Sequence, residues 1–385
     1  MNLTEKKNKF SNIEMYKWAK AIFPICRSIT GQGVRDTLHY IKKILPNLKI
    51  CSVPTGTKVF DWKIPQEWNI KDAYIKNSKG KKIIDFKKNN LHVVSYSTPI
   101  HKKIKLNELK PYLYSLPSQP KAIPYVTSYY KKRWGFCLQD SQLKKLKEDL
   151  YEVKIKSSLK NGVLNYGELI IPGKSKKEIM LTTNICHPSM ANNETSGLVV
   201  TTGIAKWLLS LKERNYTYRV TFLPETVGAI AYIKKNLKIL KKNVIAGFVL
   251  VCIGDNKTYS YLSSRSGNTL ADKAIKIGLK KSKVKKYKKY SYLERGSDER
   301  QFCSPGIDLP ICSFMRSKYH TYSQYHTSLD NLSFISKKGL DGSLQVLKNT
   351  ISYIENSKNN FKIKKKKLKE KKNKFRKKFL NSIYI

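Results

Sequence analysis

The sequence predicts an α/β protein in which a mostly parallel sheet is covered by helices on both faces. Between Thr127 and Ser357, short apolar segments typical of buried strands alternate with segments of helical periodicity. Strands are expected at 163–171, 179–184, 218–223 and 246–252, and helices at 197–212, 228–240, 268–280 and 338–356. The length of 385 residues allows a large core and more than one domain.

Two flanking regions differ in character from this alternating core. Residues 1–49 are expected to form a helical segment, because apolar residues recur at helical spacing on both sides of a polar turn at 27–31. Residues 50–117 are expected to form an inserted small β-rich domain, because strand-like segments alternate there with proline and glycine. A linker at 115–120 then leads into the α/β domain, expected at 118–358, and residues 359–385 form a Lys-rich tail.

The formal net charge of +49 raises the question of nucleic-acid binding. Lysine greatly outnumbers arginine, however, and the basic residues are spread along the chain among many Asn, Ile and Tyr residues. That pattern resembles the coding bias of an AT-rich genome. Basic residues are concentrated only at 362–378, so contact with RNA or an anionic surface is assigned to the tail.

The cellular compartment is predicted from the length of the apolar runs and from the number and spacing of the cysteines. No uninterrupted run of about 18 apolar residues occurs, which predicts no membrane span. The first residues lack the apolar centre of a signal peptide, which predicts a cytoplasmic protein. Seven scattered cysteines without a CxxC pair argue against a disulfide framework and against a cysteine zinc cluster.

The leading candidate site is a polar turn after the strand expected at 179–184. His187 and Glu194 lie seven residues apart in this turn, at the position where open α/β sheets bind ligands. Imidazole and carboxylate groups together suit a divalent metal such as zinc. The same stretch is equally consistent with a simple strand–turn–helix in which Asn and Ser cap the helix.

Other candidates also follow apolar segments. Glu225 ends the strand expected at 218–223, Asp298 and Glu299 precede a short apolar segment, and His326 lies in a polar turn. Taken singly, the carboxylates are explained by a helix dipole or by local ion pairs. Their shared placement at strand ends favours a hydrolytic site, in which a metal lowers the pKa of a water molecule and a carboxylate takes its proton.

Long blocks within residues 13–356 resemble a known family: ICRSITGQGVRDTL, CHPSMANNETSG, LPETVGAIAYI, RGSDERQFCSPGIDLP and YHTSLDN. They are similar to DUF4910, formerly DUF2172, a bacterial family of aminopeptidase-like proteins. The resemblance implies a zinc-exopeptidase fold related to M28 aminopeptidases, with the β-rich domain inserted and residues 1–49 joined to the peptidase-like domain. It also implies a link to surface polysaccharide biosynthesis and a peptide or amide-bearing small substrate.

The resemblance implies that His187 and His326 are the first and last metal histidines. M28 enzymes usually place a bridging aspartate where this chain has Asn192-Asn193-Glu194, so either Asn193 or Glu194 occupies that position. They also carry a Glu-Glu pair where this chain has only Glu225. These departures favour one metal ion over two.

The resulting hypothesis is a zinc-dependent hydrolase that cleaves a peptide or amide bond. One zinc ion is expected to bind to His187, Glu194 and His326. The expected catalytic residues are Glu225, as general base or fourth ligand, with Asp298 and Glu299. The alternative is a non-catalytic peptide- or glycan-binding module on a degenerate peptidase fold. The oligomeric state is not predicted.

Overall fold

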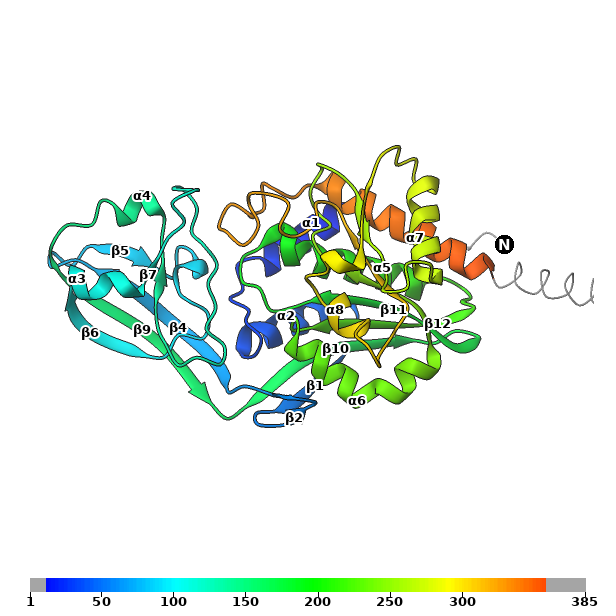
Figure 1. Cartoon of the computed structure of the whole chain (residues 1–385), viewed down its shortest axis with the longest axis horizontal. Helices are drawn as coiled ribbons and strands as arrows, with labels where there is room; N and C mark the ends of the chain where they lie inside the picture. The colour runs from blue at the N-terminus through cyan, green and yellow to red at the C-terminus, as the bar shows by residue number, and fades with distance from the viewer. Residues whose placement is uncertain (1–11, 358–385) are drawn as a thin grey trace, which may run out of the picture.

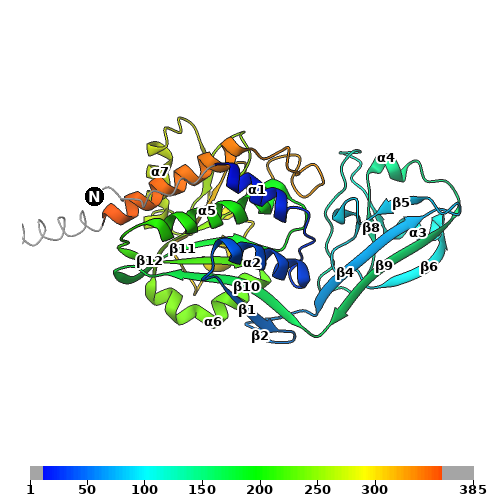
Figure 2. The same cartoon turned by 180° about the vertical axis from the view of Figure 1, so that it is seen from behind.

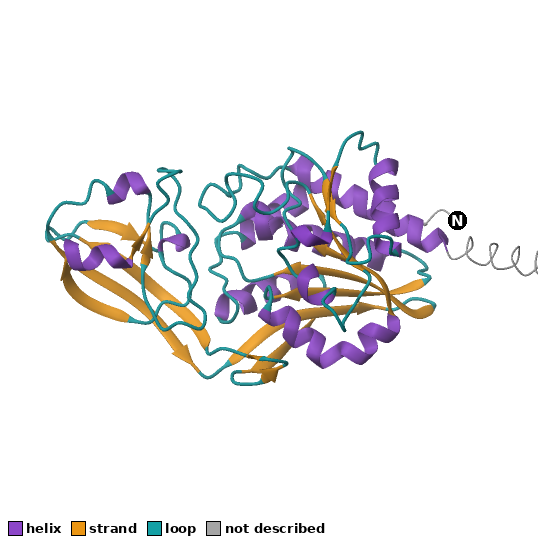
Figure 3. Cartoon of the chain, viewed as in Figure 1, coloured by secondary structure: helices purple, strands orange, loops and turns teal. Residues whose placement is uncertain are grey.

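The computed structural model describes residues 12–357, and the Lys-rich tail predicted at 359–385 lies outside the described residues. The chain forms a large and a small domain joined by long strands (Figure 1). The large domain has helices around a central sheet, whereas the small domain consists mainly of strands and loops (Figure 3). Within residues 12–357, no helix is both long and apolar enough to cross a membrane.

The large domain is built on an eight-stranded sheet. Its strand order is β1-β10-β12-β11-β13-β16-β14-β15. The central strands β12, β11, β13 and β16 are parallel neighbours, and β1 and β10 are antiparallel additions at one edge. The strand bounds are β1 (Lys49–Pro54), β10 (Val163–Ile171), β11 (Ser175–Asn184), β12 (Tyr216–Leu223), β13 (Val244–Leu250), β14 (Ser260–Leu262), β15 (Lys288–Tyr290) and β16 (Ile311–Met315).

Helices cover both faces of this sheet (Figures 1 and 2). One face packs against α1 (Asn12–Ile22), α2 (Gln32–Ile44), α5 (Ser196–Ser210), α7 (Leu270–Lys281) and a helix over 337–357. The other face packs against α6 (Val227–Asn243) and α8 (Glu299–Phe302). The α/β class with a mostly parallel, two-sided sheet is therefore confirmed.

The central helix α5 shows how the sequence produces this arrangement. Its segment SGLVVTTGIAKWLLS is apolar around most of its circumference, as expected for a helix enclosed on all sides. It lies on β11 on one side, and Gly203 on another side leaves room for Met15 and Leu344. Each buried Leu, Ile or Val side chain here contributes roughly 1.5–3 kcal/mol to folding.

The small domain has limits that differ from the predicted range of 50–117. Its four-stranded sheet has the order β5-β4-β9-β6, with bounds β4 (Glu67–Lys76), β5 (Lys82–Asp85), β6 (Ile100–Lys105) and β9 (Leu150–Lys160). The strand β1 belongs to the large sheet, and β9 belongs to the small one although it follows the expected linker. The prediction stopped short because β9 pairs with β4 across a long stretch of sequence, which local composition does not report.

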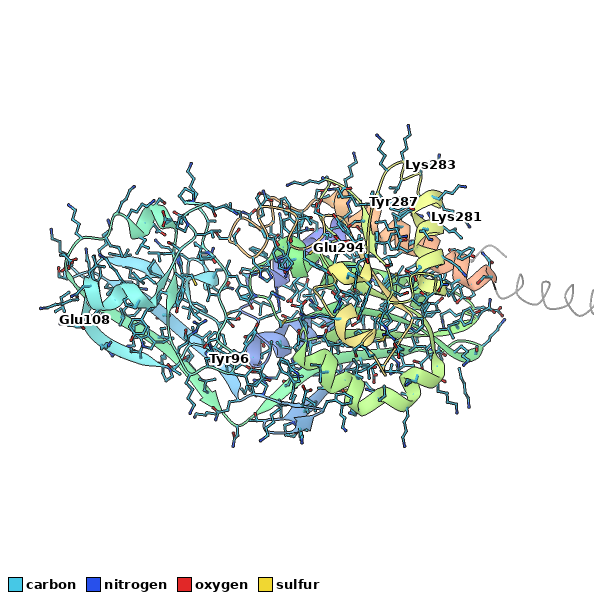
Figure 4. The ribbon with its side chains drawn as sticks, viewed as in Figure 1. Tyr96, Glu108, Lys281, Lys283, Tyr287 and Glu294 are labelled. Atoms are coloured by element: carbon cyan, nitrogen blue, oxygen red, sulfur yellow. The ribbon has the colours of Figure 1, made fainter. Side chains whose placement is uncertain are left out.

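Shorter elements complete the fold. A hairpin of β2 (Lys58–Val59) and β3 (Trp62–Lys63) lies near the junction of the two domains (Figure 1). A parallel pair of β7 (Leu113–Tyr114) and β8 (Phe136–Cys137) belongs to the small domain, where Leu113 and Phe136 are part of the core. The short helices α3 (Leu106–Leu109) and α4 (Asp140–Leu143) cover the small domain. Tyr96 lies where the two domains face each other (Figure 4).

Candidate metal and catalytic site

The register of two parallel strands brings the first two site residues together. Asn184 at the end of β11 pairs with Leu223 at the end of β12. His187 and Glu225 follow these paired ends by three and two residues, so both project beyond the same edge of the sheet. The His187 Nε2 atom lies 3.6 Å from Glu225 Oε2. The structure thus joins a predicted ligand to the predicted base.

A buried carboxylate fixes the orientation of the His187 ring. The Nδ1 atom of His187 lies 2.7 Å from Glu194 Oε2. Because an ionised carboxylate only accepts hydrogen bonds, Nδ1 carries a proton. Burial alone lowers the pKa of His187, but the contacts with Cys186 and Glu194 outweigh it and raise the pKa well above its ordinary value. Nε2 faces Glu225, so a metal ion bound at Nε2 would displace its proton while Glu194 keeps the ring oriented.

Both oxygens of Glu194 are occupied by donors. Oε2 also accepts hydrogen bonds from the backbone N–H groups of Cys186 and His187, and Oε1 accepts one from Arg27 Nε at 3.0 Å. Burial alone raises the pKa of Glu194, but the contacts with His187 and Arg27 outweigh it and lower the pKa. Glu194 therefore contacts the nitrogen of His187 that faces away from Glu225, and its predicted role as a metal ligand stays a prediction.

Arg27 is the cation that makes this buried carboxylate tolerable. It is fully buried, and its Nε also donates to the backbone oxygen of His187 at 3.0 Å. Its Nη1 donates to the backbone oxygen of Ile22 at 2.6 Å. Arg27 thus ties the loop after α1 to the turn after β11. Sequence reasoning placed this residue in a polar turn, although an arginine in an apolar block needs a buried partner.

Asp330 holds the turn that carries Glu194. This turn is a short π-helix, η3 (Ala191–Thr195), a form often found at functional sites. The backbone N–H groups of Asn192 and Asn193 donate to the Asp330 carboxylate at 2.6 and 2.9 Å. The side-chain Nδ2 of Asn193 has no hydrogen-bond partner within the described residues. Asp330 was not among the predicted site residues, because nothing local marks a carboxylate that caps a distant turn.

His326 lies on the opposite side of the same site. Its ring centroid is 5.3 Å from that of His187, and its ring stacks on Tyr325 at 3.9 Å. Its Nε2 atom is buried and has no hydrogen-bond partner within residues 12–357. Burial, together with the charges of His187 and His320, lowers the pKa of His326 well below its ordinary value. The imidazole is therefore neutral, as a metal ligand must be.

Glu225 presents one oxygen to the site and anchors the other. Oε1 accepts hydrogen bonds from Asn184 Nδ2 at 2.9 Å and from Ser297 Oγ at 2.8 Å. The next residue, Thr226, has φ 63° and ψ −75°, and Val227 N–H donates to the Glu225 carbonyl at 2.8 Å. This is a γ-turn of the rare strained kind, especially unfavourable for a β-branched residue. Backbone strain is thus used to place Glu225.

Asp298 and Glu299, both predicted to be catalytic, differ in their surroundings. Asp298 Oδ1 accepts a hydrogen bond from Thr226 N–H, and Oδ2 is buried without a partner within the described residues. Burial and the charge of Glu225 raise the pKa of Asp298 well above its ordinary value. Glu299 accepts four hydrogen bonds, from Gly296 N, Ser297 N, Tyr319 OH and Ser313 Oγ. These contacts make Glu299 a support for the loop that carries Ser297.

The segment before β8 covers the site. Tyr125 N–H donates to the His326 carbonyl at 2.9 Å, and Pro124 forms a bridge with Thr327. The Tyr125 ring lies 5.5 Å from that of His187 and 5.3 Å from that of His326. This contact was not predicted, because Tyr125 is distant from both histidines in the sequence and approaches them only through the fold.

The spacing of the His187 and His326 rings agrees with the geometry of a zinc site. Two imidazoles on one tetrahedral zinc, with Zn–N bonds of about 2.0–2.1 Å, have ring centroids roughly 5 Å apart. The 5.3 Å separation and the unpartnered Nε2 of His326 therefore fit a shared ion. A tighter group, with all ligand atoms within 4.8 Å of one another, consists of Cys186, His187 and Glu194.

This tighter group is the weaker candidate. Burial raises the pKa of the Cys186 thiol to about 12, so its thiolate would form only on a bound metal. Binding through Glu194 also requires breaking its ion pair with Arg27. His326 is not a member of this 4.8 Å group.

Comparison with solved structures shows which known fold this chain shares. The fold is that of zinc aminopeptidases: over 90% of this chain and 96% of the other, it matches the zinc aminopeptidase BSAP of Bacillus subtilis with a TM-score of 0.63 at 14% sequence identity. Residues 16–357 match the family described as "Domain of unknown function (DUF4910)". The chain belongs to this family, as its sequence blocks predicted.

Two of the matches come from Clostridium acetobutylicum. One is provisionally named a polysaccharide biosynthesis protein with an aminopeptidase-like domain, and is 49% identical over 345 residues, 90% of this chain and 78% of that protein. The other is a crystal structure provisionally named a peptidase. It matches with a TM-score of 0.87 at 48% identity, over 90% of this chain and 81% of that one.

Proposed function

We propose that this chain is a metal-dependent, aminopeptidase-like hydrolase that cleaves a peptide or amide bond and uses one zinc ion. The observation that supports this most strongly is the pairing of two buried imidazoles, His187 and His326, with ring centroids 5.3 Å apart and a carboxylate 3.6 Å from one of them. Two imidazoles beside an anchored glutamate suit metal-assisted hydrolysis, in which the ion would displace the Nε2 proton of His187.

His187 and His326 would hold the ion, and it would supply a water of lowered pKa. Glu225 would accept a proton from that water through Oε2, because Oε1 is held by Asn184 and Ser297. Glu194 would keep His187 in the tautomer that presents Nε2. In this proposal the carboxylate nearest the reacting atoms is that of Glu225, and Glu194 acts through His187.

The substrate would approach beneath the Tyr125 segment. An aromatic side chain against both histidines limits the space above them, which favours a terminal or small amide group over a chain passing through. The name of the Clostridium acetobutylicum relative supports a role in polysaccharide biosynthesis. We therefore place the scissile amide on a peptide or on an amino sugar.

Metal content tests the proposal directly. Purified protein should bind about one equivalent of zinc by elemental analysis, and chelation should abolish hydrolysis of aminoacyl reporters. His187→Ala and His326→Ala should each lose the metal. The control is His101→Ala, because His101 is an exposed residue of the small domain that pairs with Glu152. Zinc retained by both site variants would refute the proposal.

The binding-module alternative makes a different prediction for the same protein. It expects peptides or glycans to bind without turnover, with or without metal. Contact with nucleic acid or an anionic surface stays a prediction for the Lys-rich tail. Deleting residues 359–385 should abolish such binding, and raising salt should weaken it steeply.

A further inference from the structure

A groove lies between α6 and the tip of the β2–β3 hairpin, two elements that lie side by side in Figures 1 and 2. Its volume is about 490 Å³, within the range of roughly 300–1,000 Å³ that is usual for small-molecule sites. Its walls are mainly apolar: α6 contributes Ile230 and Leu237, the hairpin contributes Phe60, and the chain after α8 contributes Ile307. The proposed general base and metal ligands do not line this groove, so they give no reason for its apolar walls.

The apolar side chains of the groove are accessible. Phe60 is 39% exposed, and Ile230, Leu237 and Ile307 are each half-buried. Lys234 Nζ lies 5.2 Å from the centre of the Phe60 ring, a cation–π contact that holds the ring beside α6. A ligand in the groove would therefore meet these side chains directly.

The conformation of Phe60 is unusual for an aromatic residue. Val59 pairs with Trp62, so Phe60 and Asp61 form the two-residue loop of the hairpin. Phe60 has φ 54°, and such loop positions normally hold glycine or asparagine, whereas a bulky residue there is strained. Strained positions cluster at ligand sites, which favours a binding role for the exposed ring.

One end of the groove lies next to the proposed catalytic site. Arg300 lines the groove, and its Nη2 donates to the Oγ1 of Thr226, the residue after Glu225, at 3.1 Å. Ile230 N–H donates to the Thr226 carbonyl at 2.9 Å, so the α6 wall begins beside Thr226. At 1.5 Å per helical residue, this wall then runs about 10 Å from Ile230 to Leu237.

The charge at this end of the groove suits an acid. Arg300 is exposed, and Asp61 is the only acidic residue among those that line the groove. Amide hydrolysis breaks the C–N bond: the water oxygen joins the acyl carbon and the amine takes up the protons, which leaves a carboxylate on the acyl group. An acyl chain lying in the groove would end in this carboxylate near Arg300, a charge-assisted contact.

We propose that this groove binds an unbranched aliphatic acyl chain of the substrate, with the acyl carbon towards Glu225 and the chain along α6. The inference rests on the proposed hydrolase, because it assigns the groove to the acyl side of the same amide bond. A hydrocarbon chain suits the apolar walls better than a peptide backbone, because buried backbone N–H and C=O groups need hydrogen-bond partners. Phe60 and the α6 wall would then determine the length of chain that the protein accepts.

Isothermal titration calorimetry of the full chain with butanoate, hexanoate and octanoate tests the groove without requiring catalysis. Affinity should rise about two- to fourfold for each added CH₂ group, because complete burial of one CH₂ corresponds to about fourfold. The three acids carry the same charge, so this trend separates apolar contact from attraction to a surface rich in lysine. Octanoate should also compete with the aminoacyl reporter for the zinc-loaded protein.

Matched variants locate the binding. Phe60→Asn should weaken octanoate binding about fivefold or more, and asparagine tolerates φ 54°, so the hairpin should stay folded. Leu237→Gln, on the opposite wall, should weaken it in the same way. Tyr287→Asn is the control and should leave affinity unchanged, because Tyr287 is 37% exposed, close to the value for Phe60, and lies far from α6 (Figure 4).

The outcomes separate the groove from the hydrolase. Affinity that does not change with chain length, or an equal loss in Tyr287→Asn, would overturn the groove. Octanoate that binds but does not compete with the reporter would overturn its assignment to the substrate. Binding that depends on chain length and on Phe60, without any reporter hydrolysis, would reject the proposed hydrolase and support the groove as an acyl-chain site.

Discussion

Glu194 and Glu225 lie on opposite sides of the His187 ring, and their surroundings differ in kind. The side chain of Glu194 is 0% exposed and pairs with Arg27. That of Glu225 is 23% exposed, and one of its oxygens lies 3.6 Å from His187 Nε2. Glu194 accepts donors at both oxygens, whereas Glu225 keeps Oε2 for the site. The two residues therefore have the same chemistry but different tasks.

The difference shows that the environment assigns the role of a carboxylate. A carboxylate saturated by N–H donors and a buried cation is stable and unreactive, and serves to orient its neighbour. A carboxylate anchored at one oxygen and open at the other can bind a cation or accept a proton. Position along the sequence could not separate these cases, because both residues follow apolar strands.

The strongest test of this contrast is Glu225→Gln. The amide keeps an oxygen for Ser297 but cannot accept a proton at neutral pH. In the zinc-loaded protein, kcat for an aminoacyl reporter should fall by about 10²–10⁴-fold, the usual contribution of a general base. Zinc content and thermal stability should stay close to wild type.

Glu213→Gln is the matched control, because Glu213 is exposed and pairs only with Lys174 among the contacts found. It should leave kcat unchanged. Full activity in Glu225→Gln would remove Glu225 as the base. Zinc binding without turnover in the wild-type protein would instead favour the binding module.

The buried ion pair between Arg27 and Glu194 predicts a loss of stability when the arginine is replaced. Arg27→Met leaves Glu194 buried without its cation, which should cost about 3–5 kcal/mol of unfolding free energy. Arg35→Met breaks a partly exposed pair with Glu67 and should cost about 1 kcal/mol or less. Urea unfolding of both variants measures the difference. Equal losses would mean that Arg27 does not neutralise Glu194.

Sequence reasoning named both Glu194 and Glu225 but missed Arg27, the buried partner of Glu194. His187 and Glu225 follow neighbouring parallel strands, and that proximity follows from the general rule that strand ends meet at one edge. Arg27 meets Glu194 across 167 residues, through a loop that no periodicity describes. The strand β10 was predicted at its observed bounds, yet β9 was missed because its partners are also distant.

Asp330, whose carboxylate holds the turn that carries Glu194, predicts that the stability of the folded protein depends on pH. Burial raises the pKa of Asp330 to about 7 from 3.8, although the N–H groups of Asn192 and Asn193 oppose the shift. Because the folded protein binds the Asp330 proton more tightly than the unfolded chain does, this proton stabilises the folded state. Its contribution is complete below pH 3.8 and is lost as the pH rises to about 7.

Asp330→Asn should remove this dependence. The difference in unfolding free energy between wild type and variant should change by up to about 1.4 kcal/mol per pH unit within that window. Chemical unfolding at several pH values measures it. A difference that is constant with pH would show that Asp330 stays ionised in the folded protein.

Replacing Thr226 in the turn after Glu225 is expected to have the smallest effect on the free energy of unfolding, and to raise it. Thr226 has φ 63°, which glycine adopts without the steric cost that threonine incurs. Relief of about 1–3 kcal/mol of strain in Thr226→Gly is partly offset by the greater freedom of glycine in the unfolded chain. The loss of the hydrogen bond from Arg300 to Thr226 Oγ1 offsets it further. We expect a net gain of about 1 kcal/mol in unfolding free energy.

Thr226→Ala separates these contributions, because it loses the same hydroxyl but keeps the strained Cβ. Thr226→Gly should be the more stable of the two variants in urea unfolding, and its kcat should fall because Glu225 is held less firmly. If Thr226→Ala is the more stable, the γ-turn stores no strain. The placement of Glu225 would then depend on its hydrogen bonds with Asn184 and Ser297 alone.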